Sequence, residues 1–267
     1  MFEPFLKWAG GKRWLVQYYA GFLPQRFNRY FEPFLGSGAV FFYLVPQMAT
    51  LSDSNKGLIE TYQALKNAPK DIDKLLKLFQ KKHSPELYYS MRESIPDDLI
   101  GRAARFIYLN RTCFNGLYRV NRNGVFNVPM GSKTVVEFPD GYLEDISAAL
   151  QCATVRVSDF EVIIDQTKKG DLLYVDPPYT VMHNNNNFIK YNANLFSWND
   201  QIRLASAIRR AARRGALIML SNADSRPVRA LYRDFGNHYH LKRLSLLAST
   251  SENRGKTTEL LITNYKP

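Results

Sequence analysis

The apolar positions near the start of the chain follow a strand-like pattern. Short apolar runs that end at glycine, serine or aspartate predict strands at 29–34 and 49–51. The run Ala39–Val45 between them predicts a buried helix, and a one-sided apolar segment at 13–23 predicts a helix before Pro24. A strand, a helix and a strand in this order form a βαβ unit, which indicates a parallel sheet.

Residues 55–112 have a helical period instead. Apolar side chains three and four positions apart predict three helices, over 58–65, 72–79 and 100–108. The next segment, 114–129, alternates apolar and polar residues around Asn123-Gly124, which is typical of a β-hairpin. We therefore predict an inserted helical region that carries a hairpin.

The strand and helix pattern resumes at Ala153. Strands are predicted over 154–157, 172–175, 216–220, 241–247 and 259–265. An arginine-rich helix is predicted over 199–214. We expect residues 1–54 and 153–267 to form one α/β domain, and residues 55–152 to form a second, inserted domain.

Composition limits the class of protein. Hydrophobic residues make up 45% of the 267 residues and charged residues 22%, as in a globular chain with a buried core. The apolar run Ala39–Val45 is far shorter than the roughly 20 residues of a membrane span, and residues 1–4 do not resemble the start of a signal peptide. Two cysteines, Cys113 and Cys152, do not make a disulfide framework. We expect a cytoplasmic protein with no membrane partner.

The charge points to a partner. Lys and Arg number 36 against 24 Asp and Glu, a net +12. This excess favours a polyanion, with nucleic acid ahead of a membrane surface or an acidic protein, although many basic proteins bind no nucleic acid. Five arginines of the predicted helix at 199–214 either line a nucleic acid or form a solvated face: Arg203, Arg209, Arg210, Arg213 and Arg214.

Unusual residues follow the first two predicted strands, where ligands of open α/β sheets bind. Gly36-Ser37-Gly38 lets a ligand approach the backbone, and the helix after it favours an anionic group; the alternative is a simple tight turn. Asp53 is placed to bind the ribose hydroxyls of an adenosine-containing cofactor. The alternative is a helix N-cap, a role for which Asp53, Ser54 and Asn55 are all suited.

Asp176-Pro177-Pro178-Tyr179 follows a buried strand. The prolines stiffen the turn, so the Asp176 carboxylate and the Pro177 carbonyl can accept both hydrogens of an exocyclic amino group, with the Tyr179 ring against a flat base. Such contacts free the nitrogen lone pair for attack on a sulfonium methyl. A structural proline turn is the alternative. The loop at 180–194 either orders over the substrate or is a surface loop.

Two other kinds of site are not supported. Gly10-Gly11-Lys12 suggests a phosphate loop, but Leu6 stands where that motif needs glycine and Arg13 where it needs serine or threonine. We therefore reject nucleoside triphosphate binding. The histidines have no metal-ligand spacing, so we expect no metal site: His83, His183, His238 and His240.

Five motifs occur in one order: Lys7-Trp8-Ala9-Gly10-Gly11-Lys12, Phe31 to Gly38, Asp53, Phe114 to Arg119 with Phe126 to Pro129, and Asp176 to Tyr179. This order resembles the DNA adenine methylase (Dam) family of adenine-N6 methyltransferases, in its alpha arrangement, over nearly the whole chain. The resemblance implies a Rossmann-like sheet that binds S-adenosylmethionine, with an inserted target-recognition domain.

The resemblance also implies roles for individual residues. The cofactor would be bound by Trp8, Ala9, Gly10, Lys12, Phe34, Gly36, Ser37, Asp53, Asp159, Phe160 and Asp176, the match at Asp159-Phe160 being looser. The catalytic motif would be Asp176, Pro177, Pro178 and Tyr179, with Tyr179 stacked on the flipped adenine.

Family members that recognise GATC insert the hairpin into the major groove. Arg119 matches the arginine that contacts guanine, and Lys7 matches a base-contacting lysine. The remaining matches are Leu117 and Pro129 to apolar contacts, Phe114 to an aromatic wedge and Asn115 to a polar contact near the vacated base. The chain departs from the family pattern at Met130 and over 132–136.

Our hypothesis is a monomeric enzyme, without an obligate protein partner, that methylates adenine in duplex DNA, within GATC. Whether it belongs to a restriction-modification system is left open. An RNA or protein methyltransferase with a similar pocket is a second hypothesis, against which the hairpin argues. A catalytically inactive DNA-binding module is a third, against which the intact Asp176–Tyr179 motif argues.

Overall fold

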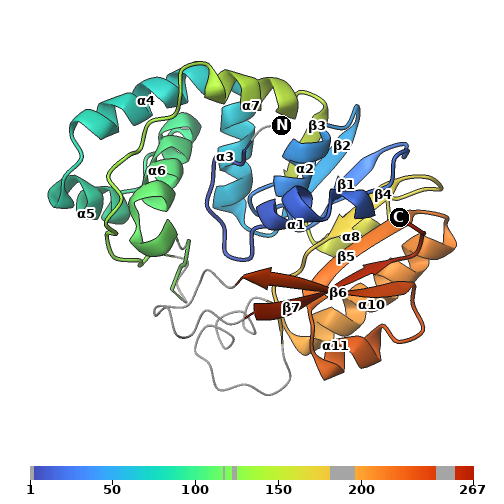
Figure 1. Ribbon diagram of the computed structural model, residues 1–267. Helices are drawn as coiled ribbons and strands as arrows, with labels where there is room; N and C mark the ends of the chain where they lie inside the picture. The colour runs from blue at the N-terminus through green and yellow to red at the C-terminus, as the bar shows by residue number, and fades with distance from the viewer. Residues whose placement is uncertain (1–2, 117, 122–124, 181–195, 245–255) are drawn as a thin grey trace. The chain divides into compact units, whose positions relative to one another are not determined.

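The computed structural model describes residues 3–116, 118–121, 125–180, 196–244 and 256–267. Their strands form a seven-stranded sheet in the order β3-β2-β1-β4-β5-β7-β6 (Figure 1). The strands are β1 (Tyr30–Glu32), β2 (Ala49–Asp53), β3 (Ala153–Val157), β4 (Leu172–Val175), β5 (Leu217–Ala223), β6 (Asn237–Leu244) and β7 (Lys256–Thr263). The α/β class expected from the sequence is confirmed.

The pairing in the sheet is mixed. Strand β1 is parallel to β2 and β4, and β4 is parallel to β5, as the βαβ pattern predicts. Strand β7 is antiparallel to both β5 and β6. This pairing corrects one expectation, because Ser221 and Asn222 lie inside β5 rather than after it, opposite Leu261 and Leu260 of β7.

The helices are α1 (Arg13–Tyr18), α2 (Ala39–Leu44), α3 (Lys56–Asn67), α4 (Pro69–Lys81), α5 (Pro85–Glu93), α6 (Leu99–Thr112), α7 (Tyr142–Leu150), α8 (Phe160–Ile164), α10 (Trp198–Arg213) and α11 (Arg226–Leu231), with 3-10 turns η1 (Ala20–Phe22) and η2 (Phe114–Gly116). The three helices predicted in the inserted region are present as α3, α4 and α6. The segment 13–23 divides into α1 and η1. Helices α5, α7, α8 and α11 were not predicted; in α5, Tyr88 is the single buried residue.

The chain forms two compact units. Unit 1 comprises residues 1–13, 36–47 and 53–157, and unit 2 comprises 14–35, 48–52 and 158–267. In unit 1, helix α3 packs against α6, α4 and α7. Its fully buried side chains include Leu58, Ile59, Tyr62 and Leu65, the positions that gave the helical period.

The core of unit 2 lies between strands β1, β4, β5 and β7 and helices α8, α10 and α11. Strand β4 is buried along its whole length, as expected for a central parallel strand covered on both faces. Helix α10 begins with a capping box in which Ser197 and Asp200 satisfy each other's backbone N–H groups. Within the described ranges, every helix is too short or too polar to cross a membrane.

Candidate active site

The Lys7–Lys12 segment folds into a tight turn in unit 1. The Gly11 N–H donates to the Trp8 carbonyl at 3.0 Å, and Gly10 has a φ of 79°. The Lys12 ammonium donates to the Gly10 carbonyl at 2.8 Å, and Lys12 is 3% exposed. The turn therefore holds its cation inward against the backbone.

Trp8, Gly36 and Asp53 lie together in unit 1. Gly36 has a φ of 47°, and a Cβ there would lie 2.7 Å from Cδ1 of Trp8, so only glycine allows this approach. The Gly36 N–H donates to Oδ2 of Asp53 at 3.2 Å, and the Tyr62 hydroxyl donates to the Gly36 carbonyl at 3.1 Å. The glycine turn is thus fixed between an indole, a carboxylate and a phenol.

Asp53 does not cap a helix. Its Oδ1 accepts from the Asn55 N–H at 2.9 Å, and it is the Asn55 side chain that caps α3, accepting from the Leu58 N–H at 3.1 Å. Desolvation raises the pKa of the Asp53 carboxyl, while the N–H donors of Asn55 and Gly36 act in the opposite direction. The capping alternative therefore applies to Asn55.

Trp8 also belongs to an aromatic stack that the sequence did not reveal. Its ring lies 5.7 Å from that of Tyr118 and 6.5 Å from that of Phe106, nearly parallel to both. The Phe106 and Tyr118 rings are 4.4 Å apart, and Phe126 follows at 5.5 Å from Tyr118. The stack joins α6, the hairpin and the turn at Trp8 within unit 1.

Asn110 is a second residue that was missed. It is fully buried on α6, where its Oδ1 accepts from the Lys7 N–H at 2.9 Å and its Nδ2 donates to the Lys7 carbonyl at 2.8 Å. Nδ2 also lies 3.4 Å from the Gly116 carbonyl. Its position on the apolar face of a helix could have indicated a structural role, because a buried amide needs hydrogen-bond partners. Asn110 fixes the backbone of Lys7.

Lys7 lies among other cations. Burial, and after it the neighbouring cations Lys133 and Arg111, together lower the pKa of its ammonium to about 8. A Cβ on Gly116 would lie 2.5 Å from Cδ of Lys7, so the glycine, with a φ of 64°, makes room for the lysine stem. The amine is held where a negative partner would stabilise its charged form.

The predicted hairpin is antiparallel at both described ends. The Phe114 N–H donates to the Pro129 carbonyl at 2.9 Å, and the Asn121 N–H donates to the Val125 carbonyl at 2.8 Å. Leu117 and the turn at Asn123-Gly124 lie outside the described residues.

Several of the predicted DNA contacts are exposed on this hairpin. Phe114 is 55% exposed, a large value for an aromatic side chain, and Asn115 and Pro129 are exposed as well. The Nε of Arg119 donates to Oδ1 of Asn127 at 3.2 Å. The hairpin therefore presents an aromatic ring and a guanidinium held by an amide.

In unit 2, Asp176-Pro177-Pro178-Tyr179 directly follows β4. Val175 is fully buried, whereas Asp176 and Tyr179 are half-buried. Burial raises the pKa of Tyr174 well above its usual value, and the negative charges of Asp176 and Glu32 raise it further. Glu32, itself 2% exposed, accepts from the Tyr30 hydroxyl at 2.9 Å. The motif therefore lies in a negatively charged part of the unit.

Phe34, Phe160 and Phe196 form an aromatic cluster in unit 2. The Phe34 and Phe160 rings stack at 5.4 Å, and Phe196 meets Phe34 edge-on at 5.5 Å. Thr180, the last described residue before 181–195, donates to the Phe196 carbonyl at 2.6 Å. The rest of the predicted loop at 180–194 lies outside the described residues.

The Asp159 carboxylate is already engaged. It accepts from the Glu161 N–H at 2.9 Å at the start of α8, and it forms a bidentate pair with Arg203, both distances being 2.9 Å. The Arg203 guanidinium also lies over the Phe160 ring, 4.2 Å from its centre. Arg203 thus holds the two residues that resemble the adenine site, and the sequence did not indicate this link.

Residues 8–245 match the family described as D12 class N6 adenine-specific DNA methyltransferase. The chain is 38% identical to the type II methyltransferase M1.LlaDCHI of Lactococcus lactis subsp. cremoris, covering 98% of this chain and 95% of that protein. It is 34% identical to the type II methyltransferase M.MjaIII of Methanocaldococcus jannaschii, covering 98% and 99%. It is also 34% identical to the DNA adenine methylase of Vibrio cholerae, covering 96% and 94%. The chain therefore belongs to the D12 class of N6 adenine-specific DNA methyltransferases.

Proposed function

We propose that this adenine-specific DNA methyltransferase transfers a methyl group from S-adenosylmethionine to N6 of an adenine flipped out of duplex DNA, within GATC. The observation that carries the proposal is the position of Asp176-Pro177-Pro178-Tyr179, directly after the buried strand β4 and half-buried. In open α/β sheets, ligands bind at the carboxyl ends of such strands.

In each unit, taken by itself, residues have chemistry that fits the proposed cofactor. In unit 1, Gly36 lets the Trp8 ring pack directly against the backbone of the glycine turn, and Asp53 is oriented by two backbone N–H groups, which suits a ribose diol. In unit 2, Phe34 and Phe160 offer apolar ring faces. When bound, S-adenosylmethionine supplies a methyl group on a positively charged sulfur.

The motif residues would act on the target amino group. The Asp176 carboxylate and the Pro177 carbonyl accept its two hydrogens, which localises the nitrogen lone pair for methyl transfer without a strong base. Tyr179 stacks on the base, which offsets part of the few kcal/mol that flipping costs. The nearby charges of Asp176 and Glu32 favour a cationic donor.

We also propose residues 55–152 as the target-recognition domain. Arg119 would exchange its contact with Asn127 for the acceptors of a guanine edge, since a guanidinium matches that pattern with two donors. Lys7 would contact a base, Pro129 and Leu117 a thymine methyl, and Phe114 and Asn115 the space of the flipped adenine. The exposure of Phe114 supports its role as a wedge.

A plasmid assay tests this function. The purified enzyme and labelled S-adenosylmethionine are incubated with plasmid DNA, and the methylated adenines are mapped by sequencing. We expect N6-methyladenine within GATC, and a loss of about 1000-fold or more in rate for Asp176→Ala, because both hydrogen acceptance and charge are removed. Asp71→Asn, at an exposed position of α4, is the control.

Three outcomes would contradict the proposal in different ways. Methylation outside GATC would overturn the roles of Arg119, Leu117 and Pro129 but not the chemistry. Full activity of the Asp176→Ala variant would overturn the catalytic role of the motif. A preference for RNA over duplex DNA in competition would favour the second hypothesis.

A further inference from the structure

Most of the arginines on α10 (Trp198–Arg213), and Arg214 directly after it, are engaged by other groups of the protein; Arg213 is the exception among the described residues. Arg203 pairs with Asp159, Glu161 and Asp200 at 2.9 to 3.2 Å. Arg210 pairs with Glu161 at 2.6 Å and with Asp165 at 2.9 Å, and Arg214 lies 3.5 Å from Asp165. These carboxylates come from α8, its flanking residues and α10 itself, so this arginine-rich face is locally close to neutral.

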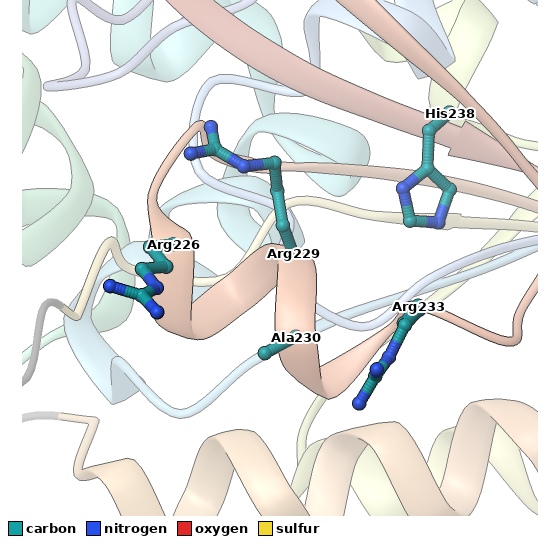
Figure 2. Close-up of a pocket in the computed structure, with 5 residues that line it drawn as sticks. All are labelled: Arg226, Arg229, Ala230, Arg233 and His238. Carbon is teal, nitrogen blue, oxygen red and sulfur yellow. The ribbon is translucent and has the colours of Figure 1, made fainter.

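A second arginine cluster in unit 2 has a different arrangement. Arg226, Arg229 and Arg233 are exposed on and just after α11, and they line an open hollow with Ala230 and with His238 of β6 (Figure 2). Asp224 pairs with Arg229 and, at 2.9 Å, with His240. Within the described residues, no carboxylate lies in ion-pair range of Arg226 or Arg233.

The arginine side chains extend in different directions from the helix. In Figure 2 the guanidinium groups of Arg226, Arg229 and Arg233 fan out around α11 instead of converging on one point. A site for a single small anion needs converging donors, whereas a chain of regularly spaced phosphates suits a spread of separate cations. The arrangement therefore favours an extended polyanion.

Helix α11 begins near the edge of the sheet that carries the catalytic motif. Strand β5 is parallel to β4, with Leu220 opposite Val175, so their carboxyl ends lie at the same edge. The catalytic motif follows β4, and α11 starts at Arg226, shortly after β5 ends at Ala223. Arg226, at the beginning of α11, is the arginine of the cluster nearest in sequence to that edge.

We infer that Arg226 and Arg233 form a docking surface for the phosphodiester backbone of the duplex DNA substrate. The inference rests on the proposed function, since it assigns this surface to the same substrate. Arg229 is fixed by Asp224 and borders the surface. The contacts are to phosphates, so they add affinity at any sequence and contribute nothing to the choice of site.

The test compares two double variants with the same loss of charge. Arg226→Gln/Arg233→Gln removes the two unpaired cations of the surface. Arg213→Gln/Lys168→Gln removes two exposed cations elsewhere in unit 2, neither of them in an ion pair among the described residues. Binding to fluorescent duplexes with and without GATC is measured by anisotropy between about 50 and 200 mM salt.

We expect Arg226→Gln/Arg233→Gln to weaken binding to both duplexes by the same factor, roughly tenfold to a hundredfold at about 0.1 M salt. The slope of log affinity against log salt should fall by about 2 for the loss of two phosphate contacts. In methyl transfer, KM for DNA should rise while kcat stays unchanged. The control double variant should keep the salt slope of the unmodified enzyme.

The two proposals fail in different ways. If the unmodified enzyme methylates GATC and both double variants have the same affinity and salt slope, the docking surface is wrong and the proposed function stands. If Arg226→Gln/Arg233→Gln loses affinity for only the GATC duplex, the surface contributes to site choice and the inference is wrong. If the unmodified enzyme neither binds nor methylates duplex DNA, both proposals are wrong.

Discussion

Helices α10 and α11 lie in the same unit and are both rich in arginine, but they differ in how many of their arginines are paired with carboxylates. Arg203 and Arg210 on α10 and Arg214 directly after it pair with carboxylates. Arg209 donates to the Leu231 carbonyl at 2.7 Å, which leaves Arg213, in the last turn, exposed. Around α11, Arg226 and Arg233 are exposed without a paired carboxylate among the described residues. The number of arginines along a helix therefore does not predict a binding surface, because nearby carboxylates determine how much of the positive charge remains unpaired.

The largest effect on folding is expected from breaking the α10 pairs. Arg203→Ala removes the contacts to Asp159, Glu161 and Asp200 and uncovers the Phe160 ring. We expect the free energy of unfolding in urea to fall by roughly 2 kcal/mol, since a network with a cation–π contact stabilises more than an isolated surface pair.

The same variant tests the link to the cofactor. We expect weaker binding of S-adenosylmethionine by calorimetry, because Asp159 and Phe160 lose the group that holds them. The control is Arg213→Ala, an exposed arginine at the end of the same helix, which should leave both quantities unchanged. Equal effects of the two substitutions would mean that the α10 pairs do not matter.

Lys7 differs from the arginines of both helices, because its neighbours are other cations. Burial, Lys133 and Arg111 lower its pKa to about 8, so its charge is present below that pH and is lost above it. In the proposed complex, in which Lys7 contacts a base, DNA would stabilise the charged form of this ammonium. We therefore expect affinity for a GATC duplex to fall several-fold as pH rises from about 7 to 9, with proton uptake in calorimetry in buffers of different ionisation enthalpy.

Raising the pH has the opposite effect on folding, because through this group it makes the free energy of unfolding larger. Because the pKa of Lys7 is about 8 in the folded state and 10.5 is its ordinary value, the unfolded chain binds the proton more tightly. This group therefore disfavours folding below pH 8, and its penalty declines as pH rises from 8 to 10.5. Lys133→Gln should raise the pKa of Lys7 and shift the loss of DNA affinity to higher pH. An unshifted profile would contradict the assignment to Lys7.

The smallest effect on folding stability is expected from substitutions on and just after α11. Arg226→Gln/Arg233→Gln removes exposed side chains that have no ion pair within the described residues, so the midpoint of thermal unfolding should stay unchanged. Differential scanning calorimetry measures this directly. A clear drop in the midpoint would mean that these arginines stabilise the fold, and the contrast with α10 would disappear.

Much of the fold could be predicted because its signals are local. The extent of β4 and the helical periods of α3, α4 and α6 follow from neighbouring positions along the chain. The end of β5 did not follow, because its last residues are held in the strand by β7, far along the chain. Tertiary pairing therefore decided where that strand stops.

The candidate site was also predictable only in part. Gly36, Asp53 and Asp176 were identified from their positions at predicted strand ends. The sequence did not reveal Asn110, which holds the Lys7 backbone, or Tyr118, which stacks on Trp8. Their roles depend on a helix and a hairpin meeting an N-terminal turn about a hundred residues away, and no local pattern records such a meeting.

The sequence by itself determined the class of enzyme, because an ordered set of motifs and the alternation of strand and helix are properties of the linear chain. It also determined the excess of 12 positive charges. Only the tertiary structure decided where that charge remains unpaired. Arg203 and Asp159 are 44 positions apart and meet across two helices, whereas Arg226 and Arg233 meet no such partner in the described residues. Ion pairing depends on distances of a few ångströms in space, and these are set by folding.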